Sequence, residues 1–415
     1  MKVLINVGGK GTRMGETGIP KALIEVNGKP ILEHQILHLK KYGLNEIILA
    51  TGYLSEKIEE YFKDGKRFGV KIIYSKEDKP LGTAGPMKLA EKFLGEEFMV
   101  LQGDLFIDFD VKRFVDFHRE KKSIGTIFVH ESSHPYDSDL IELDENKIIK
   151  RVFMVKEGEK FENLTNAGVF IFSNRVLKYI PNSFFNMEKD LYSMLLKNNE
   201  KIYGYHSEEF VKDIGTLERL NEVEDYLKRP GAIFLDRDGV INEDLPDINR
   251  IGDFKFIPRS VDGLKLLKDK KTIIITNQPV IGKGIITEDE YLRLQGQILE
   301  KIKRENVKID EIYYCPHHPE KGIGKYKIDC NCRKPKSGML KKASNDLGIN
   351  LSKSWVIGDK RSDIKCGKSV GCRTILVKTG SGGMGGNTDF EIKPDFVVDD
   401  LYEAVELILK EDGNN

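Results

Sequence analysis

The segment 232–240 joins a short apolar run to two aspartates and constrains the fold of this chain more than any other stretch. Four apolar residues lead directly into Asp236 and Asp238, and Gly239 follows. A short continuous apolar run indicates a buried strand of a parallel sheet, and such sheets bind ligands just beyond the carboxyl ends of their strands. Because residues i and i+2 leave a strand on the same side, the two carboxylates can share one metal ion and one substrate oxygen.

Two more apolar runs in this half of the chain, 272–275 and 355–357, also end in polar side chains. The polar residues that follow them include Thr276, Asn277, Gln278, Asp359 and Lys360. Helical stretches are predicted at about 261–269, 288–305 and 337–347. Strands that alternate with helices in this way predict a doubly wound α/β domain.

These strand ends, with residues 332–335 (Cys-Arg-Lys-Pro), resemble the haloacid dehalogenase superfamily of phosphatases, and more narrowly its histidinol-phosphatase and heptose-bisphosphate phosphatase branch. The resemblance implies that Asp236 is a nucleophile that forms an aspartyl-phosphate, and that Asp238 protonates the leaving alcohol and then activates water. It implies Mg²⁺ on Asp236, the Asp238 carbonyl and Asp359. The residues that it assigns to the phosphate or substrate are Thr276, Asn277, Arg333, Lys334 and Lys360.

One loop departs from that family. Residues 279–284 (Pro-Val-Ile-Gly-Lys-Gly) replace the Ser-Gly-Ile-Ala-Arg-Gly run that is usual in the stand-alone phosphatases. Because this loop borders the substrate, the resemblance leaves the identity of the substrate open.

A group of cysteines and histidines predicts a metal site at 315–332. Cys315 and His317 are followed, after twelve intervening residues, by Cys330 and Cys332. Three thiols and one imidazole in two short pairs suit a closed tetrahedral zinc site, and these ligands prefer Zn²⁺ to Mg²⁺. No ligand position stays open, so we expect a structural zinc that holds the neighbouring basic residues at the phosphate. His318 is the alternative to His317.

The amino-terminal half opens with a strand at 3–7 and a glycine-rich turn that carries Lys10 and Arg13. Glycines allow backbone amides to approach phosphate oxygens. Met14 stands where a dinucleotide-binding fingerprint needs glycine, and the turn does not form the Walker-type run, in which four residues separate a glycine from Gly-Lys-Ser/Thr. The turn therefore predicts a phosphate site of a different kind.

The glycine-rich turn, Lys21, the loop 81–85, Asp104 at the end of a strand, Asn166 at the start of another and Asp213 just before a helix resemble, in the same order, the sugar-1-phosphate nucleotidyltransferase family over residues 1–228. The resemblance implies that Asp104 and Asp213 bind the catalytic Mg²⁺ and that Asn166 holds the sugar. The residues that it places on the triphosphate, the reacting phosphorus or the base are Gly8, Gly9, Gly11, Thr12, Arg13, Lys21, Gly82 and Thr83.

Two details of this resemblance stay open. Lys156 is the candidate for contacting the sugar phosphate, and Lys160 is its rival. Asn6 and Val7 replace the usual small residues, which bears on the choice of base in a way that the sequence does not reveal.

The residues of the amino-terminal half suit the chemistry of nucleotidyl transfer. A sugar phosphate is already an anion, so its attack on an α-phosphorus needs cancellation of charge and in-line positioning rather than a strong base. Two aspartates for a metal, with Lys and Arg on the phosphates, meet those needs.

The boundary between the halves lies at residues 229–231. A helix predicted at 216–228 stops at Arg229-Pro230-Gly231, and the next strand begins at Ala232. We expect a nucleotidyltransferase domain at 1–229 and a phosphatase domain at 230–415, both doubly wound α/β (Rossmann-like, then Rossmannoid with a zinc loop), joined by a linker too short to be a flexible tether.

Charge and composition argue against nucleic acid or a membrane as a partner and bear on the cellular compartment. Sixty-six basic and sixty-six acidic residues cancel, so a broad nucleic-acid-binding surface is not expected. No apolar run approaches the roughly 18 residues of a membrane span, and glycines and charges stand where a signal peptide would have its apolar core. Five cysteines in such a chain favour the reducing cytoplasm. The sequence leaves the oligomeric state open.

One pathway needs both activities. In GDP-heptose synthesis a heptose 1,7-bisphosphate loses its 7-phosphate, and the 1-phosphate is then guanylylated. We expect a bifunctional enzyme of this pathway that uses GTP. The alternatives are the same two reactions on another sugar with dTTP or another nucleotide, a phosphatase whose amino-terminal half only senses nucleotide-sugar, and a histidinol-phosphate phosphatase.

Overall fold

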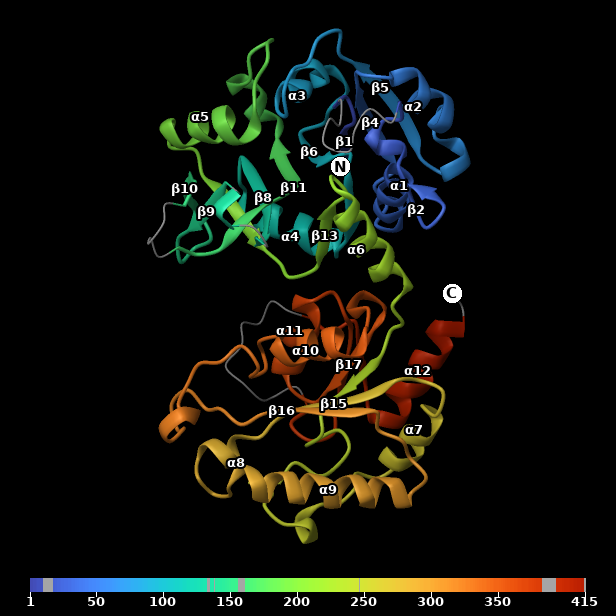
Figure 1. The fold of residues 1–415 in the computed structure, drawn as a ribbon, viewed down its shortest axis with the longest axis vertical. Helices are drawn as coiled ribbons and strands as arrows, with labels where there is room; N and C mark the ends of the chain where they lie inside the picture. The colour runs from blue at the N-terminus through green and yellow to red at the C-terminus, as the bar shows by residue number, and fades with distance from the viewer. Residues whose placement is uncertain are drawn as a thin grey trace. The chain divides into compact units, whose positions relative to one another are not determined.

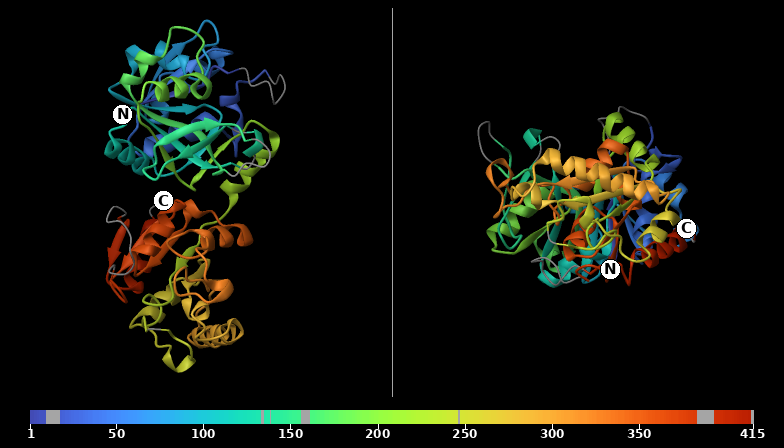
Figure 2. Two further views of the ribbon diagram at one scale, coloured as in Figure 1. Left: turned by 90° about the vertical axis from the view of Figure 1, so that its left-hand side faces the viewer. Right: turned by 90° about the horizontal axis from the view of Figure 1, so that it is seen from below.

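The computed structural model describes residues 1–9, 18–132, 135–137, 139–155, 161–245, 247–382 and 393–413. The chain forms two compact units, Met1–Leu227 and Lys228–Asn415. We call them the amino-terminal unit and the carboxy-terminal unit and describe each by itself (Figures 1 and 2).

The amino-terminal unit is built on a mixed sheet in the order β10-β9-β11-β6-β1-β4-β5, to which β8 and β12 add beside β11. These strands are β1 (Lys2–Asn6), β4 (Glu46–Thr51), β5 (Lys71–Lys76), β6 (Glu97–Gln102), β8 (Gly125–Glu131), β9 (Leu140–Leu143), β10 (Ile149–Phe153), β11 (Leu164–Ser173) and β12 (Ile202–His206). The neighbours β6, β1, β4 and β5 are parallel, whereas β11 runs antiparallel to β6. The chain moves from β1 outward to β4 and β5 and then returns to the other side of β1 with β6, so the strand order reverses between β1 and β6.

Helices cover both faces of this sheet because consecutive residues of its central strands, which point to opposite faces, are apolar. Val3 and Ile5 face α1, α2 and α4, and Leu4 faces α3 and α5. The helices are α1 (Ile31–Lys41), α2 (Ser55–Phe62), α3 (Gly85–Leu89), α4 (Val111–Lys121), α5 (Tyr192–Lys197) and α6 (Leu217–Lys228). Two further strand pairs lie outside the sheet: β2 (Glu25–Val26) with β3 (Lys29–Pro30), and β7 (Leu105–Asp108) with β13 (Phe210–Asp213).

The carboxy-terminal unit has a parallel sheet in the order β16-β15-β14-β17-β18-β19. Its strands are β14 (Ile233–Leu235), β15 (Thr272–Asn277), β16 (Glu311–Cys315), β17 (Trp355–Gly358), β18 (Arg373–Val377) and β19 (Phe396–Val398). The chain runs from β14 to β16 on one side and from β17 to β19 on the other. The order therefore reverses between β14 and β17, and the predicted doubly wound α/β class is confirmed.

Helices flank both faces of this sheet as well. Apolar residues of α7, α9 and α12 pack on the face of Leu235, and those of α10 and α11 pack on the face of Phe234. In Figure 1, α10 and α11 lie on one side of β15 and β16 and α9 lies on the other; Figure 2 (right) shows α9 along its length. The helices are α7 (Ser260–Leu266), α8 (Pro279–Gly282), α9 (Glu288–Arg304), α10 (Gly338–Leu347), α11 (Arg361–Ser369) and α12 (Leu401–Gly413). The helix predicted at 261–269 ends early, because a charged run from Lys268 offers no apolar residue to the core.

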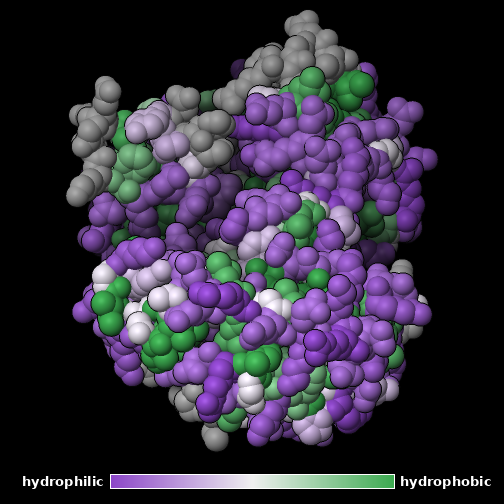
Figure 3. All heavy atoms as spheres, turned by 60° about the horizontal axis from the view of Figure 1, so that its bottom comes forward, coloured by the Kyte–Doolittle hydropathy of each residue, from purple (hydrophilic) through white to green (hydrophobic). Residues whose placement is uncertain are grey.

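Most of the face seen in Figure 3 is hydrophilic, and hydrophobic side chains appear on it in small groups. None of the helices in the described ranges combines the length and the apolar character that crossing a bilayer requires.

Acid should destabilise the amino-terminal unit through its buried histidines. Burial lowers the pKa of His38, His118 and His130, and that of His130 falls to about 4. As pH falls below about 6.5 the unfolded chain takes up protons that these folded side chains do not, so stability is lost. For His130 alone the loss reaches roughly 3 kcal/mol near pH 4.

The substitution His130→Gln should therefore reduce the loss of stability between pH 7.5 and pH 5, because Gln does not titrate. Urea unfolding followed by hydrogen exchange of peptides from the amino-terminal unit measures this loss. If His130→Gln and the wild type lose the same stability between pH 7.5 and pH 5, His130 is not held neutral in the folded unit.

Candidate active sites

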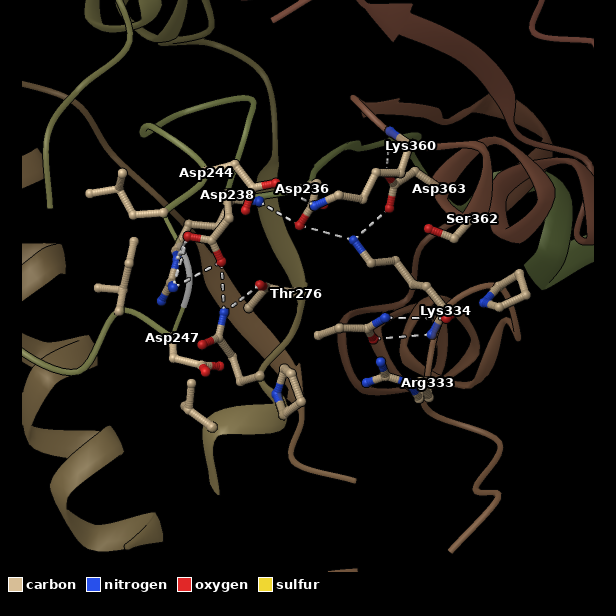
Figure 4. Close-up of a pocket in the computed structure, with 18 residues that line it drawn as sticks. Asp236, Asp238, Asp244, Asp247, Thr276, Arg333, Lys334, Lys360, Ser362 and Asp363 are labelled. Carbon is tan, nitrogen blue, oxygen red and sulfur yellow. Dashed lines mark hydrogen bonds and ion pairs between the residues drawn. The ribbon is translucent and has the colours of Figure 1, made fainter. Parts of the chain in front are cut away.

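The carboxyl ends of the central strands form a cavity in the carboxy-terminal unit. It has a volume of about 370 Å³, and Asp236 and Asp238 reach it directly from the end of β14. Thr276 enters from the end of β15 and Asp363 from α11 (Figure 4). This is where the strand order reverses, which is the usual ligand position in open α/β sheets.

The Lys334 ammonium lies between two carboxylates at the centre of this cavity (Figure 4). Its Nζ is 2.9 Å from Asp236 Oδ1 and 2.6 Å from Asp363 Oδ1, and it donates to the Ile275 carbonyl at 2.9 Å. All three charged side chains are buried. Burial lowers the pKa of Lys334, but Asp236 and Asp363 outweigh this effect and hold it above its usual range. Lys334 is therefore a permanent cation beside the nucleophile candidate.

Asp238 is held by donors on every side. Arg237 Nη2 lies 2.9 Å from both of its oxygens, Asn242 Nδ2 is 2.9 Å from Oδ1, and Gln278 Nε2 is 2.9 Å from Oδ2. Burial raises the pKa of Asp238, but the charge of Arg237 and these hydrogen bonds together lower it below its usual value. The carboxylate is thus fixed in orientation and ionised.

Asp359, at the end of β17, is fully buried, and its Oδ1 has no hydrogen-bond partner. Its Oδ2 accepts the Ser381 backbone N–H at 2.8 Å. Burial raises the pKa of Asp359 to about 6, and burial raises that of Asp236 to about 7 despite Lys334. The oxygens of Asp236, Asp359 and Asp363 lie within 4.8 Å of one another. Excess negative charge and an unpaired oxygen suit a divalent cation that takes oxygen ligands.

The remaining predicted phosphate ligands lie around the cavity, but several already have protein partners. Asn277 uses its amide on the backbone of Lys334, with N–H···Oδ1 and Nδ2–H···O distances of 3.1 Å each. Thr276 Oγ1 accepts from Gln278 at 2.8 Å. Arg333 donates to the His317 carbonyl at 3.0 Å, and Lys360 pairs with Asp244 at 2.9 Å.

The predicted metal-binding side chains meet in one cluster at the end of β16. The ligand atoms of Cys315, His317, Cys330 and Cys332 all lie within 4.8 Å of one another. Neighbouring sulfurs are 3.1–3.5 Å apart, and His317 Nδ1 is 3.3 Å from Cys332 Sγ. His318 lies outside the cluster and accepts backbone N–H groups from residues 320 and 321. The set could hold a zinc ion.

In the amino-terminal unit a second cavity, of about 340 Å³, lies beside the reversal between β1 and β6. Gly8 and Gly9 line it, as do Lys21 and Asp104, whose Nζ and Oδ2 are 3.1 Å apart. The ammonium therefore lies at the strand end that carries the first predicted metal ligand.

Asp213 lies next to Asp104 through the β7–β13 pair, where Ile214 N–H donates to the Asp104 carbonyl at 2.9 Å. Arg219 Nη1 lies 2.6 Å from both Asp213 oxygens. Burial raises the pKa of Asp213, but Arg219 and the Gly215 N–H reverse this and lower it. A metal ion at Asp213 would share the carboxylate with Arg219 or displace it.

Asn166 and Thr83 converge on Glu188, in the π-helical turn Met187–Leu191. Asn166 Nδ2 is 3.3 Å from Glu188 Oε1, and Thr83 Oγ1 is 3.4 Å from Oε2. Burial raises the pKa of Glu188. At Gly82, φ is +77° and a Cβ would lie 2.6 Å from the Phe185 carbonyl, so only glycine fits there. The predicted residues Gly11, Thr12, Arg13, Lys156 and Lys160 lie outside the described residues.

Comparison with known proteins agrees with this geometry. The family model described as nucleotidyl transferase matches residues 2–229, more than half of the chain. The chain belongs to the nucleotidyl transferase family. A second family model, HAD-hydrolase-like, matches residues 331–404.

Curated relatives resemble the two halves separately. The D-glycero-beta-D-manno-heptose-1,7-bisphosphate 7-phosphatase of Haemophilus influenzae is 40% identical over 182 residues, 43% of this chain and 96% of that protein. The mannose-1-phosphate guanylyltransferase catalytic subunit beta of Drosophila melanogaster is 38% identical over 220 residues, 52% of this chain and 59% of that subunit. The chain thus spans about three-fifths of the length of the latter. A solved structure, HddC from Yersinia pseudotuberculosis complexed with GMP-PN, is 26% identical, covers 55% of this chain and 99% of HddC, and has a TM-score of 0.48.

The predicted enzyme classes are confirmed: a nucleotidyltransferase unit is followed by a HAD-like phosphatase unit. The sequence reasoning nevertheless missed several site residues. The missed residues are the partners of four predicted ones. Asp363 pairs with Lys334, and the Ser381 backbone N–H donates to Asp359. Arg219 pairs with Asp213, and Glu188 accepts from Asn166. Arg219 and Glu188 lie in helical turns where acidic and basic residues normally face solvent, so no local signal sets them apart. Ser381 lies far from Asp359 in the sequence, and the approach of its loop to Asp359 depends on the tertiary fold.

Gly239→Ala should inactivate the phosphatase unit. Gly239 has φ of +92°, and a Cβ would lie 2.4 Å from Asp359 Oδ2, so the substitution strains the backbone and displaces Asp359. A displacement of about 1 Å can cost 10²-fold in rate, and we expect a loss of that order in kcat/KM for p-nitrophenyl phosphate.

The matched control is Gly252→Ala, because no atom lies within 4 Å of a Cβ there. Full phosphatase activity in Gly239→Ala would contradict the close approach of Gly239 to Asp359.

Proposed function

We propose that the chain is a bifunctional enzyme of GDP-heptose biosynthesis in the reducing cytoplasm. Its phosphatase unit removes the 7-phosphate of D-glycero-D-manno-heptose 1,7-bisphosphate. Its nucleotidyltransferase unit joins GTP to the resulting sugar 1-phosphate and releases pyrophosphate. The observation that carries the proposal is the presence, in one chain, of both active-site geometries, with relatives that act on a heptose bisphosphate and on GTP with a sugar 1-phosphate.

In the phosphatase unit, an Asp236 oxygen attacks the phosphorus and the bond to the sugar oxygen breaks. Lys334 neutralises the repulsion between carboxylate and phosphate. Thr276 offers its hydroxyl to a phosphoryl oxygen, and Asp238 gives a proton to the leaving alcohol. The approach of a phosphate dianion raises the pKa of Asp238, which favours the protonated form that this step needs. Once ionised again, Asp238 takes a proton from the water that hydrolyses the aspartyl-phosphate.

Asp236, Asp359 and the Asp238 carbonyl would hold Mg²⁺, which supplies further charge neutralisation at the phosphoryl oxygens. Asp104 and Asp213 would hold Mg²⁺ in the nucleotidyltransferase unit, where Lys21 neutralises charge at the reacting phosphorus. The residues proposed for the triphosphate are Gly8, Gly9, Gly11, Thr12 and Arg13, and those for the sugar phosphate and sugar are Lys156 and Asn166. No general base is required, because the attacking sugar phosphate is already an anion.

The deciding assay incubates the whole protein with heptose 1,7-bisphosphate, GTP and Mg²⁺ and identifies the product by mass. GDP-heptose is expected. If every nucleotide tried leaves only a heptose monophosphate, the transferase half of the proposal fails. If another sugar bisphosphate with dTTP reacts better, the substrate assignment is replaced.

Asp236→Asn should stop phosphate release while nucleotidyl transfer to a supplied heptose 1-phosphate continues. The amide cannot act as the nucleophile, so we expect a loss of at least about 10³-fold in phosphatase kcat. Asp104→Ala is the reciprocal variant and should spare the phosphatase. Parallel loss of both activities in either variant would argue against two separate sites.

We also propose that Cys315, His317, Cys330 and Cys332 bind one structural zinc that fixes the segment carrying Arg333 and Lys334. Metal analysis should give about one zinc per chain, with a tetrahedral site of three thiolates and one imidazole. Cys332→Ser should lose the zinc and most phosphatase activity.

Cys372→Ser should keep the zinc, because Cys372 is buried outside the cluster. Phosphatase activity that survives complete removal of zinc would show that the cluster does not support Lys334.

A further inference from the structure

Gln278 is a buried amide that contacts two residues of the proposed phosphatase reaction at once. It follows β15 directly. Its Nε2 donates to Asp238 Oδ2 at 2.9 Å and to Thr276 Oγ1 at 2.8 Å. Both hydrogens of the amide nitrogen are therefore used. An ionised carboxylate has no donor, so the nitrogen rather than the oxygen of the amide must face Asp238.

The backbone of Gln278 is fixed as well. Its N–H donates to the Cys315 carbonyl at 2.8 Å, at the end of the neighbouring strand β16. Pro279 follows, and a proline disfavours the helical conformation of the residue before it. Pro279 stands where the stand-alone phosphatases usually have Ser, so the backbone of Gln278 is more restricted here than a serine at 279 would make it.

The contact with Thr276 determines what the threonine hydroxyl can do. Thr276 Oγ1 accepts from Gln278, and among the described residues no acceptor takes the Thr276 O–H. A hydroxyl has one hydrogen to donate, and it rotates toward an available acceptor. Thr276 is buried at the wall of the cavity (Figure 4). Its hydrogen is therefore left for a phosphoryl oxygen of a bound substrate.

The contact with Asp238 holds one particular carboxylate oxygen. Arg237 Nε and Asn242 Nδ2 donate to Oδ1, whereas Gln278 donates to Oδ2. Arg237 Nη2 is shared between the two oxygens. Because one Gln278 nitrogen contacts both Oδ2 and Thr276 Oγ1, Oδ2 is the Asp238 oxygen on the phosphate side of the cavity. Without Gln278, Oδ2 would keep only the shared bond to Arg237.

We propose that Gln278 is a positioning residue that directs the Asp238 carboxyl at the leaving oxygen and the Thr276 hydroxyl at the phosphoryl group. It serves the step in which the P–O bond to the sugar breaks and a proton passes from Asp238 to the sugar oxygen. Gln278 itself gives up no proton and forms no bond to the substrate. This inference rests on the proposed phosphatase reaction and adds a residue to it.

Esters with different leaving groups test the role at Asp238. p-Nitrophenyl phosphate releases a stabilised phenolate that needs little protonation, whereas glycerol 2-phosphate and heptose 1,7-bisphosphate release an alkoxide that needs a proton. Gln278→Met provides an unbranched side chain without donors. Its kcat/KM for the two alkyl esters should fall about ten- to a hundredfold further than its kcat/KM for p-nitrophenyl phosphate.

Each rate is compared with that of the wild type on the same ester, so differences in binding between the esters cancel. Gln278→Leu should show the same preferential loss, and hydrogen exchange of peptides from β15 checks that both variants are folded. An equal loss on all three esters in folded variants would overturn the role at Asp238.

A double-mutant cycle tests the role at Thr276. Thr276→Val removes the hydroxyl and should lower kcat/KM for p-nitrophenyl phosphate about tenfold or more, as expected for a lost hydrogen bond to a charged group. If Gln278 acts on the phosphate through Thr276, Gln278→Met should cause little further loss on this ester once residue 276 is valine. Losses that multiply would overturn the role at Thr276.

The matched control is Gln297→Met, on the exposed surface of α9, which should leave all three rates unchanged. Wild-type protein that hydrolyses p-nitrophenyl phosphate and glycerol 2-phosphate but not heptose 1,7-bisphosphate would refute the proposed substrate, and the other two esters would still decide the role of Gln278. Wild-type protein that hydrolyses none of the three would refute both the proposed reaction and this inference.

Discussion

The phosphatase unit depends on one buried ammonium. Asp236, Asp359 and Asp363 are acidic side chains with oxygens within 4.8 Å of one another, and burial makes the repulsion between their charges larger than it would be in water. Lys334 offsets two of them directly. Its own position is over-determined, since the Ile275 carbonyl holds the ammonium and the Asn277 amide holds the backbone. The proposed nucleophile, Asp236, is therefore oriented before a substrate arrives.

The same topological device builds both cavities. In each unit the chain leaves the central strand in one direction and later returns on its other side, which opens a space at the carboxyl ends of two adjacent strands. Asp236 and Asp359 stand at one such reversal, and Gly8 and Asp104 at the other. The chemistry differs because the side chains differ: the phosphatase needs a nucleophile from the protein, whereas the nucleotidyltransferase only aligns two substrates and neutralises their charge.

Residues that follow a strand directly could be predicted from the sequence. Asp236, Asp359 and Asp104 each follow an apolar run, and the position of the run fixes their place in the sheet. Glu188 and Arg219 could not be predicted in this way, because each lies in a helical segment, and the packing of that segment against the core brings it to its partner on a strand, Asn166 or Asp213. For Asn277 the sequence predicts the position at a strand end but not the role. Its side-chain amide forms two hydrogen bonds with the backbone of Lys334 and so is not directed at a phosphate.

The cluster of Cys315, His317, Cys330 and Cys332 is linked through the backbone to Lys334, although sulfur has no part in the proposed phosphatase reaction. Cys332 stands two residues before Lys334, and Arg333 between them is bound to the His317 carbonyl. The position of the Lys334 ammonium is thus coupled to sulfur atoms that take no part in the proposed phosphoryl transfer. An oxidant or electrophile that modifies those thiols should displace Lys334 without reacting with any of the proposed substrate-binding groups, so we expect the phosphatase to be sensitive to thiol reagents although none of its proposed steps uses sulfur.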